Sequence, residues 1–315
     1  MKKSKSQTKL RLLYLIITIL AYGYLAYKLV HYDNYSQLSY RLQSATPWQY
    51  AALAAAILLF PVNILAEAVK WRYLVRRIYP MSFAEAVKQV FAGTTGAFIT
   101  PARVGEYPTR VMLFDRDRVE RGTELSAVTL GFVGSFALTS LQVIVGIPAA
   151  LSMLSVSKAL WLIIALLLTT YVLLPYICRF INDKLPQQDN SNVKTQLRQA
   201  LNSLAQLSAK EQIMVLLLSS MRYVIYCLQL ALLLYFCSVS LPVTTLAIAI
   251  AAYYLLVSIT PSIPVADAGI RGSWAIVAFA PLTENTIGAA IAAVILWAIN
   301  AILPMIIGTL IGNHK

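Results

Sequence analysis

Residues 98–110 read Phe-Ile-Thr-Pro-Ala-Arg-Val-Gly-Glu-Tyr-Pro-Thr-Arg, so a charged stretch with two prolines follows directly on a short apolar run. That run, 83–99, holds only about ten apolar residues, whereas a membrane-spanning helix needs about 20. Proline disfavours helix at the residue before it, so the helix is expected to end near Thr100. A full crossing would also leave the following arginines outside, against the positive-inside rule. The sequence therefore predicts a re-entrant hairpin over 83–122.

A second interrupted stretch repeats this pattern. Residues 258–264 read Ser-Ile-Thr-Pro-Ser-Ile-Pro, and the Ile-Thr-Pro triplet recurs 160 residues after its first copy. Each copy follows a long apolar run and a 17-residue segment, and each precedes another run of span length. The first copy is entered from the inside and the second from the outside. These features predict an inverted repeat with a second hairpin over 243–282. The alternative is that the prolines only kink two ordinary spans.

The composition places the chain in a membrane. Of its 315 residues, 59% are hydrophobic and 12% charged, which is more apolar than a soluble domain of this size. Six runs are long enough to cross a bilayer. They are 12–30, 50–69, 125–147, 159–178, 212–239 and 285–312. We therefore expect an all-α polytopic membrane protein with about six transmembrane helices plus two re-entrant helical hairpins.

The chain is expected to form a single membrane domain, 1–315, that is divided into four segments. Residues 1–47 are an anchor helix and an outer loop, and 48–150 are repeat unit 1. Residues 151–210 are a linking helix and a cytoplasmic amphipathic segment, and 211–315 are repeat unit 2. The anchor has no convincing cleavage site, although a signal peptide is the alternative. The polar part of the third segment fits an amphipathic helix at the inner leaflet as well as it fits a solvated linker.

Capping boxes predict where three helices begin. In each, a Ser or Thr stands three residues before a Glu or Gln, at Thr46, Ser82 and Ser208. The hydroxyl oxygen and the carboxyl or amide side chain then satisfy each other's free backbone amides.

Basic residues indicate the orientation. They cluster before the first apolar run, after the second, and in the stretches 103–121 and 179–210. The positive-inside rule puts these segments in the cytoplasm, with both termini, and favours the inner (cytoplasmic) membrane. The net charge of +13 is thus largely a topological signal. Nucleic acid is not an expected partner, because there is no soluble domain that would gather these basic residues on one face.

Residues suited to catalysis or metal binding are scarce. The only histidines, His31 and His314, lie beyond opposite helix ends, which argues against a metal site or a catalytic triad. Cys227 and Cys237 stand about 15 Å apart on one predicted helix, too far for a disulfide. An Asp-x-Asp at 115–117 is interleaved with arginines, which would repel a metal ion. We therefore expect no cofactor, no metal and no enzymatic activity.

Several motifs resemble the transmembrane region of lysylphosphatidylglycerol synthases and their stand-alone relatives. The resemblance covers nearly the whole chain. It is carried by Asn63, Glu67 and Lys70-Trp71-Arg72, by Thr100-Pro101-x-Arg103-x-Gly105-Glu106-x-x-x-Arg110, and by Pro261-x-x-Pro264 with Asp267-x-Gly269-Ile270-Arg271.

In the two-part enzymes of that family, the membrane region flips an aminoacylated lipid that a cytosolic domain makes. Because this chain ends at Lys315 without such a domain, the resemblance implies a flippase-like function without synthase activity. One departure concerns the second motif, where many relatives have an acidic residue after Gly-x-Arg and this chain has Gly272. Asp267 is the candidate to supply the missing charge.

Candidate substrate-binding residues lie at the two interruptions. If the returning segment is helical, Arg103, Glu106 and Arg110 share one flank. Arginine suits a lipid phosphate through its paired donors, and Glu106 could orient an arginine or meet a cationic headgroup. The alternative is an Arg–Glu pair that only holds the hairpin together.

The second interruption offers Asp267 and Arg271, either as a matching polar cluster or as an exposed pair at the outer surface. Thr100 and Thr260, which precede the two prolines, complete the candidate set. Glu67 and Arg222 are ionisable groups within apolar runs, where charges are costly and are usually paired or functional. We expect these two side chains to pair with each other.

These features favour a lipid flippase or scramblase that acts on a membrane phospholipid or a related anionic amphiphile. Transport of a polyprenyl-phosphate carrier lipid is an alternative in the same class. A membrane enzyme acting on lipid headgroups and a non-transporting scaffold are alternatives in other classes. The sequence leaves open whether the chain forms a homo-oligomer.

Overall fold

The computed structural model describes residues 44–118, 123–154, 177–180, 192–261 and 266–312, with a few isolated residues within 19–31 and 173–175. Within these residues the chain is helical and contains no strand. In chain order the elements are α3 (Pro47–Val75), α4 (Phe83–Ile99), η1 (Pro101–Arg103), α5 (Glu106–Val111), η2 (Arg116–Arg118), α6 (Glu124–Leu154), α8 (Asn192–Ala205), α9 (Ala209–Phe236), α10 (Val243–Ile259), α11 (Asp267–Phe279), α12 (Thr286–Trp297), η3 (Ala298–Ile302) and α13 (Leu303–Gly312).

Four of these helices are long and apolar enough to cross a membrane. They are α3 (Pro47–Val75), nearly all of α6 (Glu124–Met153), α9 (Ala209–Phe236) and the continuous run of α12, η3 and α13 (Thr286–Ile311). They match four of the six predicted runs, while the runs 12–30 and 159–178 lie largely outside the described residues. The chain is thus an all-helical membrane protein.

The predicted helix starts are confirmed. Thr46, Ser82 and Ser208 each form a complete capping box at the start of α3, α4 and α9. In the polar stretch before α9, residues 192–205 form the helix α8, as expected of an amphipathic helix. Leu204 and Ala205 of α8 are buried, and Nε of Arg179 donates to the carbonyl oxygen of Ala205 at 2.6 Å.

Two short helices end at the Ile-Thr-Pro triplets. Helices α4 and α10 each have 17 residues, and each packs against the next long or short α-helix of the chain, α5 or α11. The close approach of α5 to α4 requires glycine at position 96. A Cβ there would collide with the Thr109 hydroxyl and would lie 2.5 Å from the Gly105 carbonyl oxygen.

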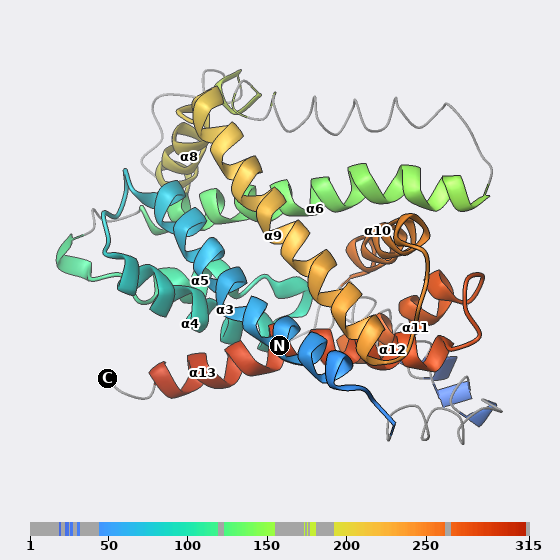
Figure 1. Cartoon of the computed structure of the whole chain (residues 1–315). Helices are drawn as coiled ribbons and strands as arrows, with labels where there is room; N and C mark the ends of the chain where they lie inside the picture. Colours follow the sequence, from blue (N-terminus) through green and yellow to red (C-terminus); the bar gives the residue numbers. More distant parts are fainter. Residues whose placement is uncertain are drawn as a thin grey trace, which may run out of the picture.

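Helices far apart in the sequence pack on one another (Figure 1). Helix α6 packs on α10, α13 packs on α4, and α3 and α9 run side by side between them. A Cβ on Gly146 of α6 would lie 2.7 Å from the carbonyl oxygen of Ala251. A Cβ on Gly308 of α13 would collide with the carbonyl oxygen of Phe91, the residue 160 positions before Ala251. The carbonyl groups that these two glycines approach therefore belong to residues 160 positions apart, and the glycines themselves are 162 positions apart.

Aromatic packing fixes the first hairpin on α3. The rings of Tyr79 and Phe114 stack with centroids 4.2 Å apart, and those of Trp71 and Tyr107 lie 5.8 Å apart. The Trp71 indole also donates to the Gln89 side chain of α4 at 2.7 Å. These contacts bring α3, α4 and α5 together around the charged residues described next.

Candidate functional site

The first cluster forms around Glu67, a carboxylate in the apolar helix α3 that is only 2% exposed. Its oxygens lie 2.8 Å from Nζ of Lys70 and 2.9 Å from Nη1 of Arg110. The second oxygen also accepts from Nη1 of Arg222. Glu67 and Arg222 do pair, as expected, but within a larger cluster in which three cations surround one carboxylate.

Lys70 is a member of this cluster that the sequence analysis did not select as a site residue. It is 1% exposed, and its ammonium group also donates to the carbonyl oxygen of Gly134 in α6 at 3.2 Å. Its spacing of three residues from Glu67 on an apolar helix was the available signal, because such residues share a face. Lys70 therefore links the Glu67 carboxylate, on the same helix α3, to the backbone of α6.

The turn at the first interruption is held by Thr100. Its hydroxyl donates to the carbonyl oxygen of Gly96 at 2.7 Å and accepts from the amide of Gly105 at 2.8 Å. Ala102 and Arg103 then adopt left-handed backbone conformations, with φ of 52° and 57°, which non-glycine residues rarely do. Such backbone is found where the surrounding structure holds it in place. Thr100 is therefore a turn residue, and it holds the turn that carries Arg103.

Helix α5 begins only at Glu106, so Arg103 precedes the helix and does not share its flank as predicted. Arg103 still reaches Glu106, with Nη2 3.2 Å from Oε2, and its side chain remains 40% exposed. Arg110 differs from the expectation. It is fully buried, with Nη1 2.9 Å from Glu67 and Nη2 2.6 Å from Glu106. Arg110 therefore has no exposed surface in this structure and holds the carboxylates of Glu67 and Glu106.

A second charged pair lies at the other interruption. Nε of Arg271 lies 3.2 Å from Oδ2 of Asp267, and Asp267 is buried. The alternative of an exposed surface pair is therefore wrong. Asp267 provides the carboxylate for Arg271 in a chain that has Gly272 at the next position. Thr260 accepts from the Trp274 indole at 2.8 Å, which ties α10 to α11.

Arg222 connects the cluster around Glu67 to a chain of amides. Its Nε donates to Asn63 at 2.8 Å and its Nη2 to the Tyr226 hydroxyl at 3.0 Å. Asn63 donates to Asn300 at 3.0 Å, and Asn300 donates to Gln229 at 3.1 Å. Asn300 lies in η3, a π-helical turn ahead of a proline, and such turns are frequent at functional sites. Polar amides within apolar runs are the signal that would have selected these residues.

A cavity of about 420 Å³ lies between the two interruptions. Arg103 and Glu106 enter it from the first turn, Arg271 and Thr260 from the second hairpin, and Arg222 from α9. The remaining walls come from α5, α6, α9, α10, α12 and η3. They include Tyr107, Phe132, Ser135, Thr139, Gln142, Tyr226, Tyr254, Ser258, Trp297 and Asn300. The structure thus gathers charged residues from both hairpins around one polar space.

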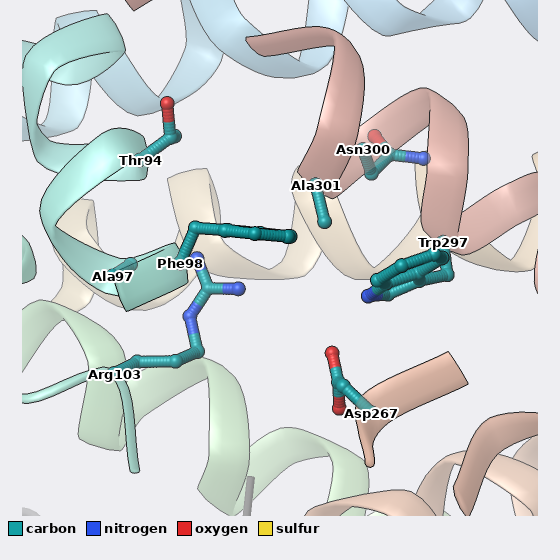
Figure 2. A pocket seen from close by; sticks show the side chains of 8 residues that line it. All are labelled: Thr94, Ala97, Phe98, Arg103, Asp267, Trp297, Asn300 and Ala301. Atoms are coloured by element: carbon teal, nitrogen blue, oxygen red, sulfur yellow. The ribbon is translucent and has the colours of Figure 1, made fainter. Parts of the chain in front are cut away.

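A smaller pocket lies beside the first turn and the start of α11. Arg103 of the first turn and Asp267 of the second both line it, and Figure 2 shows them entering it from different elements, with Trp297 on another side. Its volume of about 10 Å³ leaves room for little more than a water molecule. Opposite charges from the two halves therefore face each other beside the large cavity.

Removal of the Thr100 hydroxyl should loosen the first turn. In Thr100→Val the partly buried Gly105 amide loses its acceptor, and the loss of such a hydrogen bond costs about 0.5–1.5 kcal/mol. We expect a lower free energy of unfolding by that amount in detergent, while Thr100→Ser, which keeps the hydroxyl, should resemble the wild type. Equal stability of the valine and serine variants would show that this hydroxyl does not hold the turn.

Comparison with known families gives one match. The family model described as the lysylphosphatidylglycerol synthase TM region matches residues 12–308, nearly the whole chain. No curated protein and no solved structure matches the sequence or the fold.

Proposed function

Because the chain belongs to the family of the lysylphosphatidylglycerol synthase transmembrane region, whose function is related to membrane lipids, we propose that it moves a lipid between leaflets as a flippase or scramblase. The substrate would be a phospholipid, with or without an aminoacyl group, or a related anionic amphiphile. In this proposal the protein transports and does not catalyse a reaction, and it lies in the inner (cytoplasmic) membrane with both termini in the cytoplasm.

The observation that supports lipid movement is the charged cavity between the two interruptions. Its walls carry three arginines and one glutamate, and the helices around it present apolar side chains outward. Irregular backbone and charges are tolerated at membrane depth only where they are enclosed by protein or line a polar cavity. A headgroup would occupy this space while its acyl chains remain in the bilayer.

The proposed arrangement is six spans and two re-entrant hairpins that form an inverted repeat. Helices α4 and α10, at about 1.5 Å per residue, are about 26 Å long, less than a hydrocarbon core of about 30 Å. Helix α6 of the first unit packs on α10 of the second, and α13 of the second packs on α4 of the first, each with a close contact at a glycine, as two related halves would pack. Rocking of the two hairpins against each other would open the cavity to one leaflet and then to the other.

Reconstitution in liposomes tests this function. A labelled phospholipid in the outer leaflet is bleached by an impermeant reductant, and protein-dependent loss of the protected inner pool measures leaflet exchange. Arg103→Ala is expected to slow exchange at least about tenfold, which corresponds to about 1.4 kcal/mol. Leu310→Ala, an exposed change on α13, is the control and should exchange lipid like the wild type.

Glu106→Gln tests whether the carboxylate that pairs with Arg103 is needed for lipid exchange. This change removes the carboxylate that holds Arg103 and Arg110, so exchange should fall as well. Wild-type protein that exchanges no phospholipid, while well folded in the liposome, would contradict the proposed function.

A further inference from the structure

The charges around the cavity do not balance. Five cations take part in the ion pairs described above, and three carboxylates oppose them. The cations are Lys70, Arg103, Arg110, Arg222 and Arg271, and the carboxylates are Glu67, Glu106 and Asp267. Among the described residues of this site, two positive charges are therefore left in excess. Uncompensated charge away from water is costly, and an anion bound in the cavity would relieve that cost.

The excess charge faces the cavity. Arg103, Arg222 and Arg271 all line it, and Glu106 is the one carboxylate among its described lining residues. Lys70 and Arg110 are enclosed behind them. The cations that a ligand meets first are thus arginines from three different elements, and guanidinium groups bind phosphate through paired, directional donors.

Arg103 is the guanidinium best placed to take a new partner. Its contacts with Glu106, at 3.2 and 3.4 Å, are longer than the 2.6 Å contact that Arg110 makes with the same carboxylate. Its side chain is also more exposed than those of Arg222 and Arg271, at 40% against 13% and 20%. An incoming phosphate could therefore share Arg103 without breaking the buried cluster.

A cationic headgroup would find no comparable partner. Each of the three carboxylates already accepts from at least one arginine, and Glu67 and Glu106 each accept from two. An added ammonium group would therefore lie beside guanidinium groups, and like charges at such distances repel.

We propose that the cavity selects a phosphate-bearing lipid headgroup of net negative charge over zwitterionic and cationic headgroups. This inference rests on the proposed lipid movement and narrows its substrate class. The shared chemistry is a phosphate group with an uncompensated negative charge. It can come from an anionic glycerophospholipid or from a polyprenyl-phosphate carrier, and both sources are arms of the test.

The test compares three labelled lipids with identical acyl chains in the same liposome assay. They are phosphatidylglycerol, phosphatidylcholine and lysylphosphatidylglycerol, with headgroup charges of about −1, 0 and +1. We expect phosphatidylglycerol to exchange at least about tenfold faster than either of the others. Equal rates for all three would overturn the charge selection and leave lipid movement intact. If none of the three lipids exchanges, and a labelled polyprenyl phosphate does not exchange either, the proposed function itself is contradicted.

Competition distinguishes the two sources of phosphate. Each unlabelled lipid is added in the same amount, and the exchange rate of labelled phosphatidylglycerol is measured. If unlabelled polyprenyl phosphate reduces this rate much more than unlabelled phosphatidylglycerol does, the carrier lipid is the preferred ligand. The opposite order would identify a glycerophospholipid. If unlabelled phosphatidylcholine reduces the exchange of phosphatidylglycerol as much as both anionic lipids do, the proposal is overturned.

A charge-matched set of variants separates selection from structure. Arg271→Gln lowers the excess charge by one, Asp267→Asn raises it by one, and the double variant restores it. We expect the ratio of phosphatidylglycerol to phosphatidylcholine exchange to fall in the first, to rise in the second and to return to the wild-type value in the third. A purely structural ion pair would reduce both rates alike, so an unchanged ratio across the set would overturn the proposal.

Binding by the wild-type protein gives a readout that requires no variant. Short-chain phosphatidylglycerol should raise the melting temperature in neutral detergent, and short-chain phosphatidylcholine at the same concentration should raise it less, because at equal concentration the ligand that binds the folded state more tightly stabilises it more. An equal shift with both lipids would count against charge selection.

Discussion

Replacement of Glu67 by glutamine is expected to lower the free energy of unfolding by about 3–5 kcal/mol, because loss of one partner leaves buried charges without compensation. In this protein the loss affects three cations together, Lys70, Arg110 and Arg222. The variant should therefore melt at a lower temperature and yield less monodisperse protein on size-exclusion chromatography after heating in detergent.

A double variant distinguishes this charge effect from the loss of packing. Glu67→Gln with Lys70→Met removes one charge of each sign, so it should be more stable than Glu67→Gln alone. The exposed pair of Glu85 and Arg118 provides the control, since exposed pairs contribute little. If Glu67→Gln melted like Glu85→Gln, the cluster around Glu67 would not hold the helices together.

Replacement of Gly308 by leucine is expected to separate α13 from α4. Even a Cβ at this position would collide with the Phe91 carbonyl oxygen and lie 2.6 Å from the Thr95 hydroxyl, and the carbonyl belongs to backbone that cannot rotate away. Overpacking of a close contact costs about 1–3 kcal/mol, occasionally more. We expect loss of lipid exchange with a lowered melting temperature.

Controls for Gly308 come from both halves. Ile306→Ala changes an exposed residue of the same helix and should have little effect. Gly146→Leu makes the equivalent change in the first half, where a Cβ would lie 2.6 Å from Cβ of Leu255. If the halves are related as proposed, both leucine variants should have similar effects. A stable and active Gly308→Leu would show that the close contact of α13 with α4 is not required.

Local signals in the sequence predicted much of the fold. The lengths of the apolar runs predicted four of the spans, and three Ser or Thr caps predicted where α3, α4 and α9 begin. Both 17-residue helices end at the residue before Thr-Pro, as the prolines indicated. These features depend on residues within a few positions of one another, which is why they can be read from the sequence.

The roles of the individual charged residues depended on contacts between distant segments. Arg110 was expected to meet a substrate, but Glu67, 43 residues away, encloses it together with Glu106. The sequence left open whether Asp267 is exposed or buried, and the tertiary structure buries it. Spacing along a helix shows which side chains share a face, but it does not show which other helix covers that face.

The sequence by itself determined that this chain lies in a membrane, where its short helices begin and end, and which residues carry charge into apolar segments. Only the tertiary structure decided which of those charges are enclosed and which face the cavity. The physical reason is that hydrophobicity, capping and proline act within a few residues. Burial and the pairing of charges are set by helices that meet from positions far apart in the chain.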